Sequence, residues 1–239
     1  MVPEATTTLI PIHDDNPTRS FPWLTVLLIA GNIAIFGFEV TRSPAELAQF
    51  IDRWAFVPAR LQTGPALAAL LTVVTSAFLH GGWLHLGGNM LYLWVFGNNI
   101  EDRLGPIRFV LFYLACGLAA ALAQTAAAPM SPVPMVGASG AIAGVLGAYL
   151  MLFPRAKVVT IVPIFFYIEA AALPAAFVIG FWFVLQIAQG LSALGGTMET
   201  GVAWWAHVGG FAAGIALVAP LVARDALNRW QLRKTRARR

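Results

Sequence analysis

The sequence predicts an all-α, polytopic membrane protein built as a bundle of six transmembrane helices. Of its 239 residues, 59% are hydrophobic and only 11% are charged, against roughly 25% charged in an ordinary soluble domain. A soluble fold of this size could not bury so much apolar surface, so the bilayer must solvate most of the chain. The length fits one compact membrane domain. With one cysteine, Cys116, an internal disulfide is excluded.

Crossing the hydrocarbon core as a helix takes about 20 predominantly apolar residues. Six stretches of about this length occur, and we expect each to cross the membrane: 21–40, 83–100, 106–127, 135–153, 173–191 and 203–222. The segment ahead of the first stretch carries Glu4, Asp14 and Asp15 in place of a positive cluster. We therefore interpret the first stretch as a membrane helix and not as a cleavable signal peptide.

These spans divide the chain into an N-terminal arm (1–20), a membrane domain (21–222) and a basic tail (223–239). Six crossings put both termini on one side, and the distribution of Lys and Arg indicates which side that is. Most basic residues fall on the side of the termini: Arg19, Arg103, Arg108, Arg155, Lys157, Arg224, Arg229, Arg233, Lys234, Arg236, Arg238 and Arg239. The opposite side has only Arg42, Arg53 and Arg60, which predicts that both termini are cytoplasmic.

The basic tail also accounts for the positive net charge. Attraction to an anionic leaflet is worth about 1 kcal/mol per basic residue, so the charge requires no nucleic-acid partner. We expect a multi-pass protein of a bacterial inner (plasma) membrane, with the lipid bilayer and membrane proteins as its partners. The oligomeric state is not predicted.

The loop 41–82 is too long and too apolar for a plain linker. Ser43-Pro44-Ala45-Glu46 is typical of a capping box with proline at the first helical position. It predicts an amphipathic helix lying in the outer interface. The stretch 65–79 is apolar but short, and a seventh span there is the alternative. The stretch 158–172 contains a proline and a glutamate, so we interpret it as an interfacial approach to the fifth helix.

Polar side chains inside spans are costly and indicate function. Here they are His80, His85, Asn89, Ser139 and His207. The second, fourth and sixth helices all begin on the extracytoplasmic side, and the last four of these residues lie within about two turns of a helix start. At 1.5 Å rise per residue, they share one depth, some 3–10 Å below the outer end. The pattern predicts one site made by three helices.

Ser139 and His207 have the chemistry of a nucleophile and its base. Small residues spaced by four usually indicate close helix packing, and a lone intramembrane histidine is often structural. In combination, however, the glycines of the fourth and sixth helices let two backbones approach. A hydroxyl and an imidazole then come within hydrogen-bond reach, as activation of a serine requires. No carboxylate is placed to serve as a third member, so we predict a Ser–His dyad, with neither cofactor nor metal.

His85 and Asn89 lie four residues apart and therefore on one helix face. Both side chains can donate hydrogen bonds to a developing oxyanion. Together with the backbone N–H of Ser139, they predict an oxyanion hole for acyl transfer.

Three motifs on three helices resemble the rhomboid family of intramembrane serine proteases, and the likeness extends over 21–222. The motifs are His80-xxxx-His85-xxx-Asn89, Gly137-Ala138-Ser139-Gly140 and Ala206-His207-xx-Gly210-xxx-Gly214. The resemblance implies a six-helix bundle whose site opens to the extracytoplasmic face. It implies single-span membrane proteins as substrates, cut near the outer interface. It also gives supporting roles to His80, Gly137, Gly140 and Gly210.

One position departs from this resemblance. Some members carry an aromatic residue one turn after the serine, on which the histidine ring stacks, whereas this chain has Ala143. Either another ring replaces it or the imidazole is less firmly oriented. Phe181 and Trp182 in the fifth helix resemble the family's lateral gate toward lipid.

Two other classes of function compete with the protease. A catalytically silent rhomboid-like adaptor would bind membrane clients, but such relatives typically lack the serine or the histidine, and both are present here. A transporter predicts polar groups near the bilayer centre, whereas these cluster in the outer leaflet. The sequence therefore favours an intramembrane serine endopeptidase.

Overall fold

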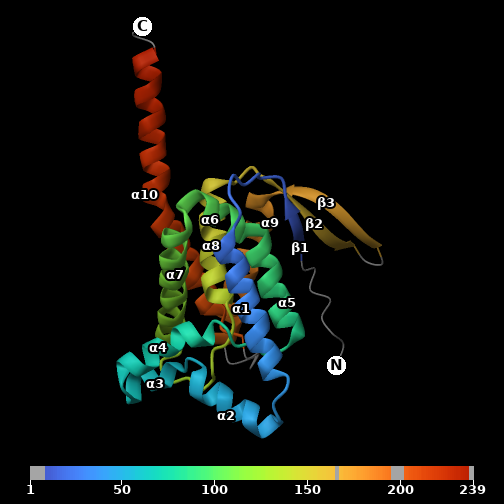
Figure 1. The fold of residues 1–239 in the computed structure, drawn as a ribbon, viewed down its shortest axis with the longest axis vertical. Coiled ribbons are helices and arrows are strands. Elements are labelled where there is room, and N and C mark those ends of the chain that lie inside the picture. The colour runs from blue at the N-terminus through green and yellow to red at the C-terminus, as the bar shows by residue number, and fades with distance from the viewer. Residues whose placement is uncertain (1–8, 165–166, 195–201, 237–239) are drawn as a thin grey trace.

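The computed structural model describes residues 9–164, 167–194 and 202–236 (Figure 1). Parts of the predicted arm and tail, including Glu4, Arg238 and Arg239, lie outside the described residues. The first half of the chain forms β1 (Ile10–Asp14), α1 (Trp23–Glu39), α2 (Pro44–Trp54), α3 (Pro58–Thr63), α4 (Ala66–Ser76), α5 (Trp83–Tyr92), the π-helical segment η1 (Leu93–Gly97) and α6 (Asn98–Leu104). The second half forms α7 (Pro106–Ala127), α8 (Ser139–Leu152), β2 (Lys157–Ile164), β3 (Tyr167–Pro174), α9 (Ala175–Leu194) and α10 (Trp204–Arg236).

A helix lies at each of the six predicted stretches. The second stretch is continuous through α5, η1 and α6, and the others correspond to α1, α7, α8, α9 and α10. Among the described residues, α7 and the 175–193 part of α9 are long and apolar enough to cross a membrane. The 14 residues of α8 rise about 21 Å, less than a typical hydrocarbon core of about 30 Å. Six crossings therefore remain a prediction.

The fold is mostly helical, but the prediction of an all-α fold was wrong. Three strands form an antiparallel sheet in the order β1-β2-β3, in which His13 of the arm pairs with Val159, and Val159 with Ala172. Within the stretch 158–172, expected as an interfacial approach, the described residues thus belong to β2 and β3, which pair with each other. The run of valine, threonine and isoleucine in this stretch favours extended backbone, and the arm supplies the third strand.

The loop between α1 and α5 folds much as predicted at its start. The amide of Ser43 donates to Glu46 Oε2 (2.9 Å), and the amide of Glu46 donates to Ser43 Oγ (3.4 Å), so the capping box at the start of α2 is confirmed. The 11 residues of α4 rise about 16 Å, too short for a seventh span. In Figure 1, α2, α3 and α4 lie at the end of the bundle opposite the sheet.

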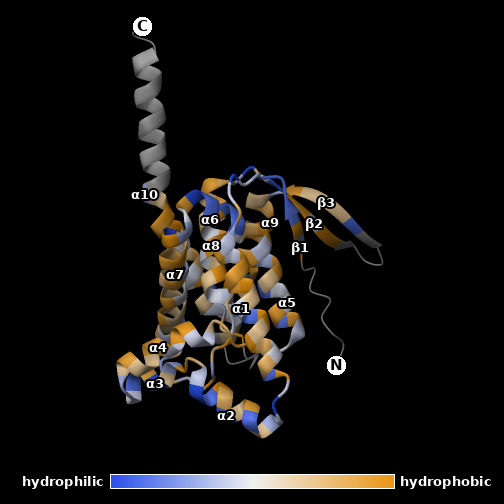
Figure 2. Ribbon diagram, in the orientation of Figure 1, coloured by the Kyte–Doolittle hydropathy of each residue, from blue (hydrophilic) through white to orange (hydrophobic). Residues whose placement is uncertain are grey.

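Figure 2 shows hydrophobic residues along the helices between these two ends, with hydrophilic residues concentrated around α6, in the loops near β1 and on α2. The largest buried side chains include Phe96, Phe109, Leu146, Tyr149 and Ile179. They come from η1, α7, α8 and α9, so the core lies inside the bundle. The helices therefore pack around one apolar centre.

Helices α8 and α10 meet at glycines. A Cβ added at Gly210 would collide with the carbonyl oxygen of Gly140, and one at Gly214 would collide with that of Gly144. Only hydrogen fits at these two positions, so the two backbones are in direct contact. The close approach that the glycine spacing predicted is present, and it brings the start of α10 beside the start of α8.

Candidate active site

Ser139 and His207 face each other across the α8–α10 contact. Ser139 is the first residue of α8, and His207 lies in the first turn of α10. The Ser139 Oγ is 2.8 Å from the His207 Nε2. This is the distance at which an imidazole can accept the proton of a serine hydroxyl. The structure thus brings together the two residues predicted to form the dyad.

Gly137 shapes the turn that leads into Ser139. Its φ of +110° is in the region that L side chains rarely adopt. An added Cβ would also lie 2.7 Å from the His85 Nε2 and 3.3 Å from the Asn89 Nδ2. Its own amide donates to the carbonyl of Ser76 (2.9 Å), which ties the turn to the end of α4. Glycine here lets two side chains of α5 approach the serine.

His85 presents a donor to this turn. The amide of Gly81 donates to the His85 Nδ1 (3.4 Å), which assigns the ring proton to Nε2. Nε2 is the atom that lies against Gly137. One turn further along α5, Asn89 is buried and directs its amide nitrogen to the same place. Two side-chain donors therefore lie close to the start of α8.

His80 forms a second layer behind Asn89. The His80 Nδ1 lies 3.3 Å from the carbonyl of Phe78, which can only accept, so Nδ1 carries the proton. The Nε2 then accepts from the Asn89 Nδ2 (3.0 Å). Because an amide nitrogen has two hydrogens, one remains to point elsewhere. The His80 backbone amide also donates to the buried Glu39 carboxylate (3.2 Å).

Four of the predicted site residues line one cavity of about 940 Å³, whereas His80, Gly137, Gly140 and Gly210 lie outside its lining. Ser139, His207, His85 and Asn89 all contribute to its wall, as does Trp182 of α9. Among the described residues, no group of three or more His, Cys, Asp or Glu could hold a metal ion. The polar side chains that line the cavity carry hydroxyl, imidazole, amide and indole groups.

Sequence reasoning missed Gln186. Its side chain is buried on α9, and its Oε1 lies 2.7 Å from the His207 Nδ1. The signal was present, because a glutamine in the middle of an apolar span is a costly residue. It was missed because only carboxylates were considered as a third member.

The position of Ala143 is also accounted for. Ala143 is buried without a ring to offer His207, but two tryptophans flank the imidazole. The Trp182 ring centroid is 5.9 Å from that of His207, and the Trp204 centroid is 6.1 Å away. Phe181 is instead exposed and stacks on Phe177. Other rings thus occupy the surroundings of the histidine.

Comparison with known proteins gives a consistent result. The rhomboid domain family matches residues 68–224. Rhomboid protein 1, mitochondrial, of Saccharomyces cerevisiae is 33% identical over 144 residues, which cover 58% of this chain and 39% of that protein. RHOMBOID-like protein 1 of Arabidopsis thaliana is 30% identical over 224 residues (82% and 52%). Rhomboid protease GluP of Bacillus subtilis is 45% identical over 78 residues (33% and 15%). The matched regions span about half or less of these relatives.

Proposed function

The chain belongs to the rhomboid family and is therefore an integral membrane protein, and we propose that it is an intramembrane serine endopeptidase. The observation that carries this proposal is the 2.8 Å approach of the Ser139 Oγ to the His207 Nε2. The two atoms face a cavity that also receives two donors from α5. A hydroxyl, its base and oxyanion donors in one place are what acyl transfer needs.

The reaction would proceed through an acyl-enzyme. Ser139 Oγ attacks the scissile carbonyl while His207 Nε2 takes its proton, and the tetrahedral oxyanion forms. His207 then gives the proton to the leaving amine, and the Ser139 ester remains. A water, deprotonated by His207, attacks the ester to form a second tetrahedral intermediate. This intermediate collapses as His207 returns the proton to Ser139 Oγ, and the product leaves as a carboxylic acid that ionises in water.

The oxyanion would lie between α5 and the start of α8. His85 offers Nε2–H and Asn89 offers the second Nδ2 hydrogen. The backbone N–H of Ser139 is in the first turn of α8, where amides have no partner within the helix. The three donors differ in kind, so the loss of one leaves the other two in place.

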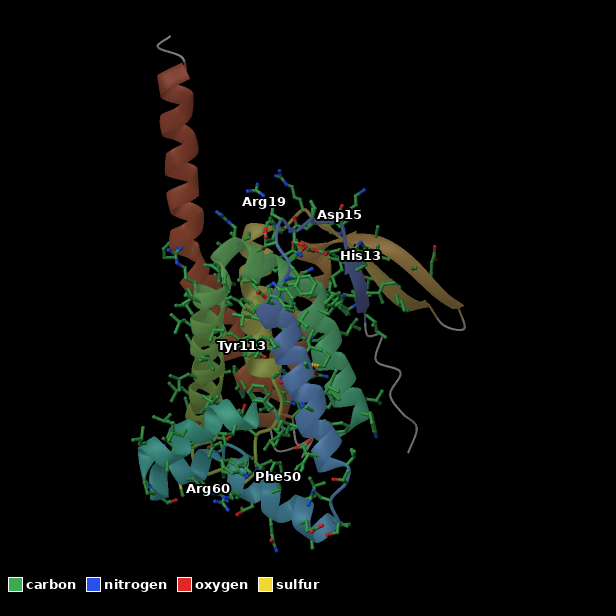
Figure 3. All side chains as sticks on the ribbon, in the orientation of Figure 1. His13, Asp15, Arg19, Phe50, Arg60 and Tyr113 are labelled. Atoms are coloured by element: carbon green, nitrogen blue, oxygen red, sulfur yellow. The ribbon has the colours of Figure 1, made fainter. Side chains whose placement is uncertain are left out.

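The proposed substrates are single-span membrane proteins cut near the outer interface. The dyad lies at the starts of α8 and α10, at the end of the bundle where α2, α3 and α4 lie (Figure 1). Figure 3 shows Arg19 and Asp15 at the opposite end of the bundle, whereas Arg60 lies at the same end as α2, α3 and α4. Basic residues are concentrated at the end of the bundle where Arg19 lies, which supports a cytoplasmic orientation for that end.

A reporter fused after Arg239 tests this orientation. It should be active only if it functions in the cytosol. Activity of an export-dependent reporter at that position would invert the topology and place the site on the wrong face.

Labelling by a fluorophosphonate tests the chemistry directly. The wild-type protein in detergent should label on Ser139, the label should disappear in Ser139→Ala and it should fall strongly in His207→Ala. A folded wild-type protein that neither labels nor cleaves any model transmembrane substrate would favour the silent adaptor. If the wild type does label on Ser139, a quantitative proteome comparison between wild-type and Ser139→Ala cells should identify single-span proteins shed only by the wild type.

A further inference from the structure

Gln186 approaches the catalytic histidine on the side opposite the serine. His207 uses Nε2 toward Ser139 and Nδ1 toward Gln186, at 2.8 and 2.7 Å. Both ring nitrogens are therefore engaged at hydrogen-bond distance. What the base can do depends on which of them holds the proton of the neutral ring.

The orientation of the Gln186 amide decides this. Its Nε2 lies 3.3 Å from the carbonyl oxygen of Trp182, one turn earlier in α9. A carbonyl only accepts, so the NH₂ group points to Trp182 and the Oε1 points to His207. The Oε1 likewise only accepts, which requires the proton on Nδ1. The Nε2 is then free to accept the proton of Ser139.

We propose that Gln186 is a positioning residue that holds His207 in the tautomer required of a base, as the neutral third member of a hydrogen-bonded Ser139–His207–Gln186 triad. The inference deepens the proposed protease function and rests on it. Three hydrogen bonds follow one another in this arrangement. The Ser139 hydroxyl donates to the His207 Nε2, the His207 Nδ1–H donates to the Gln186 Oε1, and the Gln186 amide donates to the Trp182 carbonyl. When His207 takes up a proton during attack, Nδ1 keeps its own, so the bond to Gln186 persists.

The surroundings of Gln186 suit this role. The side chain is buried with only 6% of its surface exposed, so water does not compete for its amide. It comes from α9, whose Trp182 ring also flanks the imidazole. An amide in an apolar span needs partners for its polar atoms, and here these partners are the Trp182 carbonyl and the His207 ring.

Substitution of Gln186 by methionine removes the acceptor at nearly constant size. The Nδ1–H would lose its partner, and the tautomer with the proton on Nε2, in which Ser139 faces a donor, would gain population. We expect the turnover rate to fall about 10- to 100-fold with little change in KM. Gln189→Met is the matched control, since it makes the same change one turn along α9. Among the described residues, the Gln189 side chain forms no hydrogen bond. This variant should cleave at the wild-type rate.

Gln186→Glu tests rescue. A carboxyl group keeps an acceptor oxygen at the place of Oε1 whether or not it is ionised, so this variant should retain most of the turnover rate that Gln186→Met loses. Melting curves for each variant separate rate from folding. A merely structural glutamine predicts the reverse pattern, with lower melting temperatures in both variants and unchanged turnover in the folded fraction, and that result would overturn the proposal.

Nitrogen NMR of ¹⁵N-histidine-labelled protein reads the tautomer without any substitution at Gln186. The His207 signals are identified by their loss in His207→Ala. We expect the neutral ring of the wild type to be protonated on Nδ1, and an Nε2-protonated ring would refute the assignment. The activity measurements separate the two proposals. A wild type that neither labels nor cleaves contradicts the protease, whereas a wild type that cleaves no faster than Gln186→Met contradicts the triad alone.

Discussion

Helix α10, which carries the histidine, packs on α7, α8 and α9, and its contacts with α8 and with α9 differ in kind. Against α8 it packs backbone on backbone, with Gly210 and Gly214 on the carbonyls of Gly140 and Gly144. Against α9 it packs through side chains, in which Phe183 stacks on Phe211 with ring centroids 4.0 Å apart and Gln186 reaches the imidazole.

The two contacts therefore control different features of the site, namely the distance between Ser139 and His207 and the orientation of the His207 ring. The α8 contact sets how far the serine lies from the histidine, and it leaves no room for adjustment because an added atom meets backbone. The α9 contact sets how the ring is turned, through groups that can be exchanged one at a time. Changes on the α8 side should therefore act on folding as well as on rate, whereas changes to polar side chains around the ring should act mainly on rate.

The largest effect is expected from the dyad, where both contacts converge. Ser139→Ala and His207→Ala should each remove cleavage, by about 10⁴-fold or more, while the protein stays folded, because neither change touches the glycine contact. The double variant should be no worse than either single one, since the two residues act as one unit. Single-turnover cleavage of a model transmembrane substrate measures this. Turnover in Ser139→Ala well above background would place the nucleophile elsewhere.

Asn89→Ala tests whether a polar side chain of α5, like those of α9, affects mainly the rate and not the folding. If Asn89 stabilises the oxyanion, the rate constant should drop by roughly 10- to 1,000-fold while substrate binding stays nearly unchanged. His85→Ala should act similarly, with some added loss of stability from the cavity it opens. The same single-turnover assay, run beside melting curves, checks both. An Asn89→Ala protein that melts far lower yet cuts at the wild-type rate where folded would refute the oxyanion assignment.

Gly214→Ala should break the α8 contact itself. The added Cβ would meet the carbonyl group and, at 2.7 Å, the Cα of Gly144, and overpacking of this kind costs about 1–3 kcal/mol or more. Gly180→Ala in α9 is the control, since a Cβ there meets nothing within 4 Å and helix propensity improves by at most about 1 kcal/mol. Thermal melting in detergent should show a loss only for Gly214→Ala. Equal melting temperatures would mean that α8 and α10 can separate freely.

The smallest effect concerns the far end of α8. Asp14 of β1 is buried and accepts hydrogen bonds from Asn99 and from Tyr149 of α8, and burial raises the pKa of its carboxyl group above the ordinary value. The folded state therefore favours the protonated form. That contribution to stability is fully present below the unfolded pKa and is lost as pH rises through the folded pKa.

Asp14→Asn should remove this pH dependence. Its melting temperature relative to the wild type should therefore rise as the pH is raised from acidic to neutral. Cleavage at a fixed pH should not change, because Asp14 lies at the sheet end of the bundle. A difference that grows toward acidic pH would have the wrong sign and would contradict the burial argument.

The parts of the site that could be predicted are those encoded by helical periodicity. Ser139, His207, His85 and Asn89 are polar residues near helix starts, and spacing alone places them at one depth. Gln186 lies deeper in its span and near no motif, so its role depends on how α9 is rotated. That rotation follows from packing such as that of Phe183 on Phe211, which local sequence does not encode.

The fold shows the same division. Each predicted stretch contains a helix because apolar length is a local signal. The sheet joins Ile10 to Ile161, and pairing across so long a separation leaves no periodic trace in either segment. The π-helical segment within the second stretch is also invisible to hydropathy. It lies where the chain must fit beside α1: a Cβ at Gly97 would be 3.3 Å from the Thr25 Oγ1.

The order of the dyad along the chain has a consequence for biosynthesis. His207 follows Ser139 by 68 residues, and at roughly 5–20 residues per second a ribosome delivers it about 3–14 s later. During that interval the nascent chain holds a serine with no base to activate it. The proposed protease would therefore be silent while it is being inserted, and could not cut other clients of the insertion machinery before its chain is complete.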